Sequence, residues 1–392
     1  MRLALALVLI CCLLFAARPV RAESQRSVYW AGFAFTGEYA RRHSITPASA
    51  AVIEKHGLIP LNATLYTTLR DHPPKHFALI GDSLARLDGS TSATVLAAAL
   101  DRELVSVEPI GGKYKLLIEV ALEALFFDYR DRQVIAAYPV TLQYIDLLDH
   151  PPGKAEIQAI VADLLYGDTA TSLPRALAQT LTQARLPEAA MKRLQVGEVE
   201  ISAEARAALP RSLSKADKER DLRMTLAHEF SKLLSTNTNI GLLPYARGEA
   251  VGATMAARFS DGRVFQLKIP AADYQVRLRL DRFVERVHEE DEAMRLLLFG
   301  AFFTVKVVDP FLGTVFFDQP LRKGELKTVP STQTGVDHWA AWYETLLGGL
   351  DTFAGATVNR SGTRDWLSQQ KPGGSALNQQ ISSLQELIAS CR

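Results

Sequence analysis

Histidines, which often bind metals, are scattered along this sequence rather than grouped. His228 and His288 are each followed by a glutamate, but neither has a second histidine at the spacing of a zinc-protease helix. The pair His72 and His76 is separated by Pro73-Pro74, which prevents a helix that would bring both rings to one face. No Walker-type phosphate loop, dinucleotide glycine fingerprint or paired-cysteine site occurs. We therefore predict no metal site and no cofactor.

One serine lies in a pattern associated with nucleophilic catalysis. The apolar run Phe77–Ile80 is followed directly by Gly81-Asp82-Ser83-Leu84, which resembles the first block of the GDSL family of esterases. The resemblance implies that Ser83, next to Asp82, is a nucleophile at the end of the first strand. The structural alternative is that Asp82 or Ser83 caps a turn where the strand ends.

The remaining parts of an esterase site are missing from the sequence. A serine nucleophile needs a base for its proton and donors for the oxyanion, which the GDSL family supplies through a later Gly-x-Asn-Asp and an Asp-x-x-His. No Gly-x-Asn-Asp occurs, and Asp149-His150 and Asp337-His338 are adjacent pairs rather than spaced ones. We therefore predict no catalytic set and favour a protein that is not an enzyme, with a GDSL-like serine esterase using Ser83 as an alternative.

Two arginines lie on one face of a predicted strand. From Tyr274 to Asp281 apolar and polar residues alternate, which places Arg277 and Arg279 on the same outward face. The acidic stretch His288-Glu289-Glu290-Asp291-Glu292 follows nearby. Such faces are usually only solvated. If this strand lies at a sheet edge, its open backbone groups and its arginines could accept a strand from a protein partner.

The first 22 residues have the three parts of a secretory signal peptide. Arg2 supplies a positive charge, Leu3–Ala17 is apolar, and Val20-Arg21-Ala22 is a small-residue cleavage site. We predict cleavage between Ala22 and Glu23, export to the periplasm, and no membrane span after the signal is removed. Secretion is one alternative; an uncleaved anchor is disfavoured because arginines interrupt the apolar run before the roughly 20 residues needed to span.

Composition agrees with an exported globular protein. Of 392 residues, 48% are hydrophobic and 22% charged, with 44 Lys plus Arg and 43 Asp plus Glu. Without the three arginines of the leader the chain is close to neutral, which excludes a general basic field for nucleic acid. Two of the three cysteines lie in the leader, so the remaining Cys391 cannot form an intramolecular disulfide. This pattern is typical of a bacterial periplasmic protein.

The first half of the chain predicts a long β-hairpin. Tyr114–Phe127 alternates as a strand, with Glu119 and Glu123 on its wetter face, and Val134–Ile145 is the returning strand. Before it, we predict a strand at Phe77–Ile80 and a helix at 91–104.

A similar hairpin is predicted in the second half. Leu296–Val308 is a strongly apolar strand, followed by the turn Asp309-Pro310-Phe311-Leu312-Gly313. Superposing Leu116 on Leu297 also places Asp128 on Asp309, and Leu100-Asp101-Arg102 resembles Leu280-Asp281-Arg282, with a small insertion afterwards in the second copy. We interpret this as a diverged internal duplication, with chance similarity of two amphipathic hairpins as the alternative.

Apolar residues at helical spacing predict helices over 154–166, from Ser172 onward, over 217–234 and over 336–353. Residues 355–374, rich in Gly and Ser, are predicted to be a linker to a last helix at 376–389. That helix carries an apolar stripe of four residues that either packs on its own domain or is offered to a partner: Leu377, Ile381, Leu384 and Ile388.

The predicted fold class is α+β, with two diverged α/β units that carry long β-hairpins and are joined by a helical segment. The predicted division is a signal peptide at 1–22, a first unit at 23–152, a helical connector at 153–235, a second unit at 236–355, and a linker with the C-terminal helix at 356–392.

The second unit resembles the small α/β domain shared by the TolB amino-terminal domain, the periplasmic part of the curli secretion channel and the flagellar H-ring proteins. The residues that carry the resemblance are Tyr274–Asp281, Phe303–Asp309 and Gly313–Asp318. The resemblance covers about a third of the chain, without invariant chemistry, and implies envelope assembly through protein contacts. The chain lacks a plausible lipid-attachment cysteine, which puts the pore formation of the curli channel in doubt.

The leading hypothesis is therefore an exported periplasmic scaffold or accessory protein of a bacterial cell-envelope complex, with an envelope protein as partner. The alternatives are the serine esterase and a periplasmic small-molecule or lipid carrier with a pocket between the two units. The sequence indicates no oligomeric state.

Overall fold

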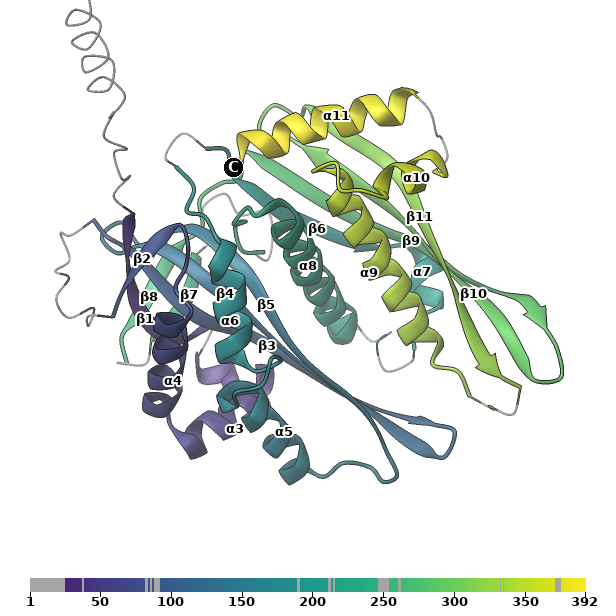
Figure 1. Ribbon diagram of the computed structural model, residues 1–392, viewed down its shortest axis with the longest axis horizontal. Helices are drawn as coiled ribbons and strands as arrows, with labels where there is room; N and C mark the ends of the chain where they lie inside the picture. The colour runs from purple at the N-terminus through teal and green to yellow at the C-terminus, as the bar shows by residue number, and fades with distance from the viewer. Residues whose placement is uncertain are drawn as a thin grey trace, which may run out of the picture.

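The protein folds around two β-sheets, with helices between and outside them (Figure 1). The computed structural model describes residues 25–392 apart from 37–38, 82–83, 85–86, 88–91, 189–190, 211–212, 214–215, 246–253, 260–261, 332, 334 and 371–374. Ala22 and Glu23 at the predicted cleavage site, and the motif residues Asp82 and Ser83, lie outside the described residues. The mixture of helices and strands confirms the predicted α+β class.

The first sheet has seven strands and closes on itself. Its order is β2-β1-β3-β4-β5-β8-β7, and β7 also pairs with β1. β1 is parallel to β2 and β3, whereas β3, β4 and β5 form an antiparallel meander. Because β7 and β8 come from late in the chain, the second half completes the sheet of the first. The strands are β1 (Arg26–Thr36), β2 (Phe77–Ile80), β3 (Thr94–Ile110), β4 (Lys113–Asp128), β5 (Gln133–Leu148), β7 (Thr254–Phe259) and β8 (Val264–Lys268).

The second sheet has four strands in the order β11-β10-β9-β6. β6 is parallel to β9, and β9, β10 and β11 form an antiparallel meander. The strands are β6 (Leu194–Ile201), β9 (Tyr274–Glu290), β10 (Met294–Val308) and β11 (Val315–Pro330). Both predicted hairpins are confirmed, and each is longer than the sequence pattern indicated.

The strands β1-β3-β4-β5 and β6-β9-β10-β11 follow the same plan down to their irregularities. In each sheet three residues form bulges, at which the pairing skips one residue that has no partner on the neighbouring strand. The skipped positions correspond between the sheets: Ala31 and Gly197, Asp101 and Asp281, Ile135 and Phe316. β9 skips one further residue, His288, which accounts for the small insertion expected in the second copy. Bulges are local features that an alternating pattern does not fix, so their coincidence argues against a chance similarity of two hairpins.

The two hairpin turns also use the same device. The amide of Asp131 donates to Asp128 Oδ1 at 2.8 Å, and the amide of Phe311 donates to Asp309 Oδ1 at 2.8 Å. Four residues after each of these two aspartates the backbone enters the left-handed region, with φ of 51° at Arg132 and 70° at Gly313. An aspartate that accepts its own loop's amides suits such turns because it fixes the loop without another element.

Helices cover the outside of the first sheet. Their apolar faces form one core with β1, β3, β4 and β5. The elements here are the 3-10 turn η1 (Tyr39–Arg41) and the helices α2 (Arg42–Ile45), α3 (Pro47–His56), α4 (Leu58–Asp71), α5 (Lys154–Tyr166) and α6 (Leu173–Gln183), of which α3 to α6 supply the core residues.

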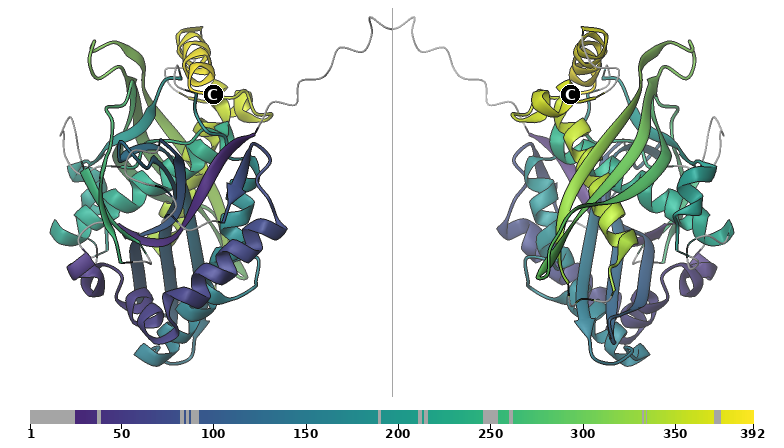
Figure 2. Two further views of the ribbon diagram at one scale, coloured as in Figure 1. Left: turned by 90° about the vertical axis from the view of Figure 1, so that its left-hand side faces the viewer. Right: turned by 90° about the vertical axis from the view of Figure 1, so that its right-hand side faces the viewer.

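The second sheet shares its core with the remaining helices. In the side views, α9 runs along the strands and α11 lies at one end of the molecule (Figure 2). These helices are α7 (Ala203–Ala207), α8 (Ala216–Thr238), α9 (His338–Ala356), α10 (Thr363–Ser368) and α11 (Ser375–Ser390). The predicted helical connector, 153–235, therefore divides in space, since α5 and α6 pack on the first sheet and β6 and α8 belong with the second.

The helix predicted at 91–104 is wrong, because this segment lies in strand β3 from Thr94 onward. Residues 95–100 are all buried, since both faces of β3 are covered. A strand covered on both faces is a continuous apolar run rather than an alternating one. Its leucines and alanines therefore also matched helical spacing.

The predicted linker, 355–374, is only partly irregular. It contains α10, whose Trp366 is buried and donates its indole N–H to the backbone oxygen of Arg322 at 3.0 Å. The following helix, α11, is confirmed at 375–390, and its apolar stripe lies in the core of its own chain: Leu377, Ile381, Leu384 and Ile388. This conformation corresponds to the intramolecular alternative, in which the stripe is closed to a partner.

Replacing Leu384 by Ala tests that position of α11. The substitution leaves a cavity among core side chains, so we expect the free energy of unfolding to fall by about 2–5 kcal/mol. Denaturant unfolding of the purified protein measures it, with Glu386→Ala on the exposed side of the same helix as control. An unchanged stability for Leu384→Ala would show that the helix is not part of the core.

Candidate functional site

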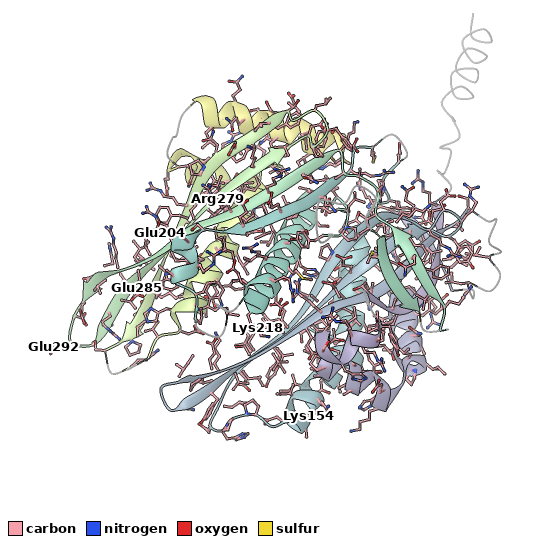
Figure 3. The ribbon with its side chains drawn as sticks, turned by 180° about the vertical axis from the view of Figure 1, so that it is seen from behind. Lys154, Glu204, Lys218, Arg279, Glu285 and Glu292 are labelled. Atoms are coloured by element: carbon pink, nitrogen blue, oxygen red, sulfur yellow. The ribbon has the colours of Figure 1, made fainter. Side chains whose placement is uncertain are left out.

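The second sheet is covered by helices on one face only. The core shared with α8, α9, α10 and α11 uses the residues that alternate toward one side of β9, β10 and β11. Figure 3 shows the other side, with Arg279 in view and the short helix α7 beside the sheet at Glu204. Among the described residues, no helix lies across this side. We call it the open face.

The open face combines arginines with apolar side chains. Arg282 lies over the ring of Phe302, with its guanidinium carbon 4.3 Å from the ring centroid. Arg279 is paired with Asp281 at 2.7 Å but stays 54% exposed, and Arg277 lies 3.8 Å from Glu198. Exposed pairs of this kind contribute little to stability. These guanidinium groups are therefore accessible to carboxylates of a partner.

The predicted residues Arg277 and Arg279 do share an outward face, but β9 is not an edge strand. It is paired with β10 on one side and β6 on the other. Strand addition at β9 is therefore excluded, because its backbone groups are already bonded to neighbours. These arginines can contact a partner only through the face of the sheet.

The equivalent face of the first sheet is occupied. Arg102 follows the skipped Asp101 just as Arg282 follows Asp281, yet Arg102 is only 8% exposed. Helix α8 packs there, and Thr141 of β5 donates its hydroxyl to Glu229 of α8 at 2.6 Å. One half of the chain therefore shows how this kind of face is covered by a helix.

Between the first sheet and helices α8 and α9 lies a buried group of ionisable side chains, which we call the inter-sheet cluster. Glu119 is 3% exposed and Glu123 8%. Burial, together with the nearby carboxylate of Glu229, raises the pKa of Glu119 to about 7. Burial, together with Asp101, raises the pKa of Glu123 to about 8. The other members are Arg102, His228, Glu229, Lys232 and Tyr343.

Burial also shifts the two uncharged members of this cluster. It lowers the pKa of His228 well below its ordinary value and raises the pKa of Tyr343. Both changes favour the neutral forms, so the charges in the cluster are those of the carboxylates, Arg102 and Lys232. Several buried atoms of the cluster have no hydrogen-bond partner among the described residues, including Glu119 Oε1, Glu123 Oε2 and Arg102 Nη2.

Sequence reasoning missed this cluster. It placed Glu119 and Glu123 on the wetter face of their strand, whereas α8 buries that face. Two glutamates inside an otherwise apolar strand were the available signal. Their partners on α8 and α9 are distant in sequence, so spacing alone could not reveal them.

The two adjacent Asp-His pairs of the sequence are engaged in other contacts. Asp337 caps α9 by accepting from the amide of Ala340 at 2.9 Å and also pairs with Lys115. His338 is paired with Glu285, and His150 lies 3.9 Å from Glu156. The contact of Asp337 joins the two sheets, since Lys115 lies in β4 and Asp337 caps α9.

Two searches of the described residues concern metals and membranes. They contain no group of three or more His, Cys, Asp or Glu that could hold a metal ion. They also contain no helix long and apolar enough to cross a membrane.

Comparisons with known proteins find no relative by sequence. No known protein family matches the chain, and no curated protein does. Among the solved structures that align with about half of the chain are three bacterial proteins. The first is a neuraminyllactose-binding hemagglutinin homolog from Helicobacter pylori, with 13% identity over 51% of this chain and 93% of that one and a TM-score of 0.26. The second is a DUF330 protein from Xanthomonas campestris, with 15% identity over 47% of this chain and 94% of that one and a TM-score of 0.24. The third is a minor lipoprotein from Acinetobacter baumannii, with 12% identity over 45% of this chain and 90% of that one and a TM-score of 0.19.

Similarities at these scores establish neither a shared family nor a shared function. None of the three is a TolB amino-terminal domain, a curli channel component or a flagellar H-ring protein. That resemblance stays a prediction.

The inter-sheet cluster predicts that stability depends on pH. The pKa of Glu123 is higher in the folded protein, at about 8, than its ordinary value of 4.5, so folding favours the protonated form. The contribution of Glu123 to the free energy of unfolding is fully present below about pH 4.5 and is lost as the pH rises toward 8. We expect Glu123→Gln to flatten this decline and to raise the free energy of unfolding at pH 8 by about 1 kcal/mol or more relative to the wild type.

Urea unfolding between pH 5 and pH 8 measures the effect. Glu290→Gln, which changes an exposed glutamate of β9, is the control. A Glu123→Gln variant with the same slope as the wild type would show that this carboxyl does not titrate as expected.

Proposed function

We propose that this protein is an exported periplasmic scaffold or accessory protein of a bacterial cell-envelope complex, and that it acts by docking a protein partner on the open face of its second sheet. The observation that carries the proposal is the difference between the two sheets. The first has both faces covered, whereas the second has helices on one face only. Its bare side carries apolar groups that water alone covers in the isolated chain.

The chemistry of the open face favours an amphipathic helix that carries carboxylates. Phe302 and Leu298 are half-buried apolar groups of β10 on this face, and three arginines lie along the neighbouring strand β9: Arg277, Arg279 and Arg282, of which Arg282 lies over the ring of Phe302. The same kind of face on the first sheet is covered by α8, whose Glu229 carboxylate accepts from the hydroxyl of Thr141 on that face. A partner helix with acidic and aliphatic residues would repeat this arrangement.

The leader sequence supports the envelope location, since a charged start, an apolar stretch and a small-residue cleavage site are the signals for export. We also propose that the two sheets descend from one duplicated unit, because their skipped residues and their turns correspond. In such a duplication the first copy is closed by the second, and the second retains the unoccupied face. No contact of the described residues favours the esterase or the carrier alternative.

The docking proposal is tested by photocrosslinking in the native envelope. A photoreactive residue at Phe302 is expected to form a covalent adduct with a partner, and Arg282→Glu in the same protein is expected to reduce the yield about tenfold or more because it opposes the partner's carboxylates. A photoreactive residue at Lys154, at the exposed start of α5, is the control (Figure 3). Equal yields from both positions, or no effect of Arg282→Glu, would contradict docking at the open face.

Export is tested separately, by fractionating cells and sequencing the amino terminus of the mature protein. We expect the protein in the periplasmic fraction, beginning at Glu23. Full-length protein in the cytoplasm that still carries Met1 would contradict export. That result would not bear on the open face, which the crosslinking experiment tests independently.

A further inference from the structure

The edge strand β11 is protected along only part of its length. The amide of Arg322 donates to Gln370 Oε1 at 2.8 Å, and the amide of Asp318 donates to Gln380 Oε1 at 3.3 Å. Between them, Pro320 has no N–H to offer. Side chains from the C-terminal helices and a proline therefore satisfy or remove the edge donors from Asp318 to Arg322.

The next part of the same edge is open. Because residues alternate along an antiparallel ladder, Gly324, Leu326 and Thr328 point their backbone groups the same way as Arg322, away from β10. Among the described residues, none donates to or accepts from these outward groups. Leu326 is also 52% exposed, and Pro330 ends the open stretch. An unpaired edge with an exposed aliphatic side chain is a template for another strand.

We propose that this stretch pairs with β11 of a second copy of the chain, antiparallel and centred on Leu326, to form a symmetric dimer. In this register Glu325 lies opposite the partner's Lys327, and Lys327 lies opposite the partner's Glu325. Leu326 meets the partner's Leu326. Arg322 lies opposite the partner's Pro330. The N–H of Arg322 already donates to Gln370, and proline has no backbone N–H. Opposite charges in cross-strand pairs favour one register, and a two-fold axis doubles each contact.

The corresponding edge of the first sheet does not offer this complementarity. Ile145 of β5 occupies the position equivalent to Leu326 and is 55% exposed. Its neighbours are Tyr144 and Asp146, and the Asp146 carboxylate already accepts from the Tyr144 hydroxyl and the Leu147 amide. Self-pairing of β5 brings no opposite charges together, and pairing β5 with β11 in the same register sets Asp146 against Glu325. Charge complementarity therefore favours pairing of β11 with β11 over the pairings that involve β5.

The dimer would join two four-stranded sheets into one of eight strands. A two-fold axis perpendicular to the sheet keeps both open faces on the same side, so the docking surface doubles in width. The pairing segment is short compared with stable interfaces, which bury about 1,200–2,000 Å². The association is accordingly expected to be weak and reversible.

Sedimentation equilibrium of the mature protein over a range of concentrations tests the proposal. The wild type is expected to show a monomer–dimer equilibrium. Glu325→Lys sets lysine against lysine and Lys327→Glu sets glutamate against glutamate, so each variant alone is expected to dimerise roughly tenfold more weakly. A one-to-one mixture of the two variants restores opposite charges at both pairs and is expected to recover the wild-type association.

Ile145→Lys, which changes the matching aliphatic residue of β5, is the control and should leave the equilibrium unchanged. Circular dichroism of each variant verifies the fold, since Lys327 also pairs with Glu344. A wild type that stays monomeric at every concentration overturns the proposal and leaves the edge to a strand of another protein. The proposal is also overturned if the charge changes leave dimerisation unaffected, or if the mixture of the two variants fails to recover association.

Discussion

The requirement that both faces of an apolar sheet be covered determines most of this structure. Helix α8 meets it for two sheets at once. Leu226 and Phe230 lie in the core of the second sheet, whereas His228 and Glu229 face the first. β7 and β8 then close the first sheet with strands from the second half of the chain. The first half cannot bury its sheet alone, so the two halves are expected to fold as a cooperating pair rather than as independent domains.

The surface between the halves is polar as well as apolar, and this has an energetic consequence. Burying Glu119 and Glu123 opposes their ionisation, and Arg102 and Lys232 offset only part of that cost. Such a cluster contributes less stability than an apolar contact of equal size, and buried atoms of Glu119, Glu123 and Arg102 have no hydrogen-bond partner among the described residues. The cluster is therefore a cost to stability rather than a source of it.

The sequence predicted the strongly periodic elements and missed what depends on tertiary contacts. Alternation around Leu116 and Leu297 predicted both hairpins, and helical spacing predicted α5, α8 and α9. The segment around Val95 misled because a strand buried on both faces has no alternation. Arg277 and Arg279 were placed on the correct side of a strand, but whether that strand is an edge depends on β6, which pairs with it from a different part of the chain.

The two sheets share a plan but differ in how one face is used. Each has an arginine that follows a skipped aspartate, Arg102 in the first sheet and Arg282 in the second. Helix α8 covers this face of the first sheet, and Arg102 is buried there. Among the described residues no helix covers the corresponding face of the second sheet, where Arg282 lies over the ring of Phe302. The apolar and cationic groups around Phe302 are the reason for proposing that an acidic helix from another protein docks there.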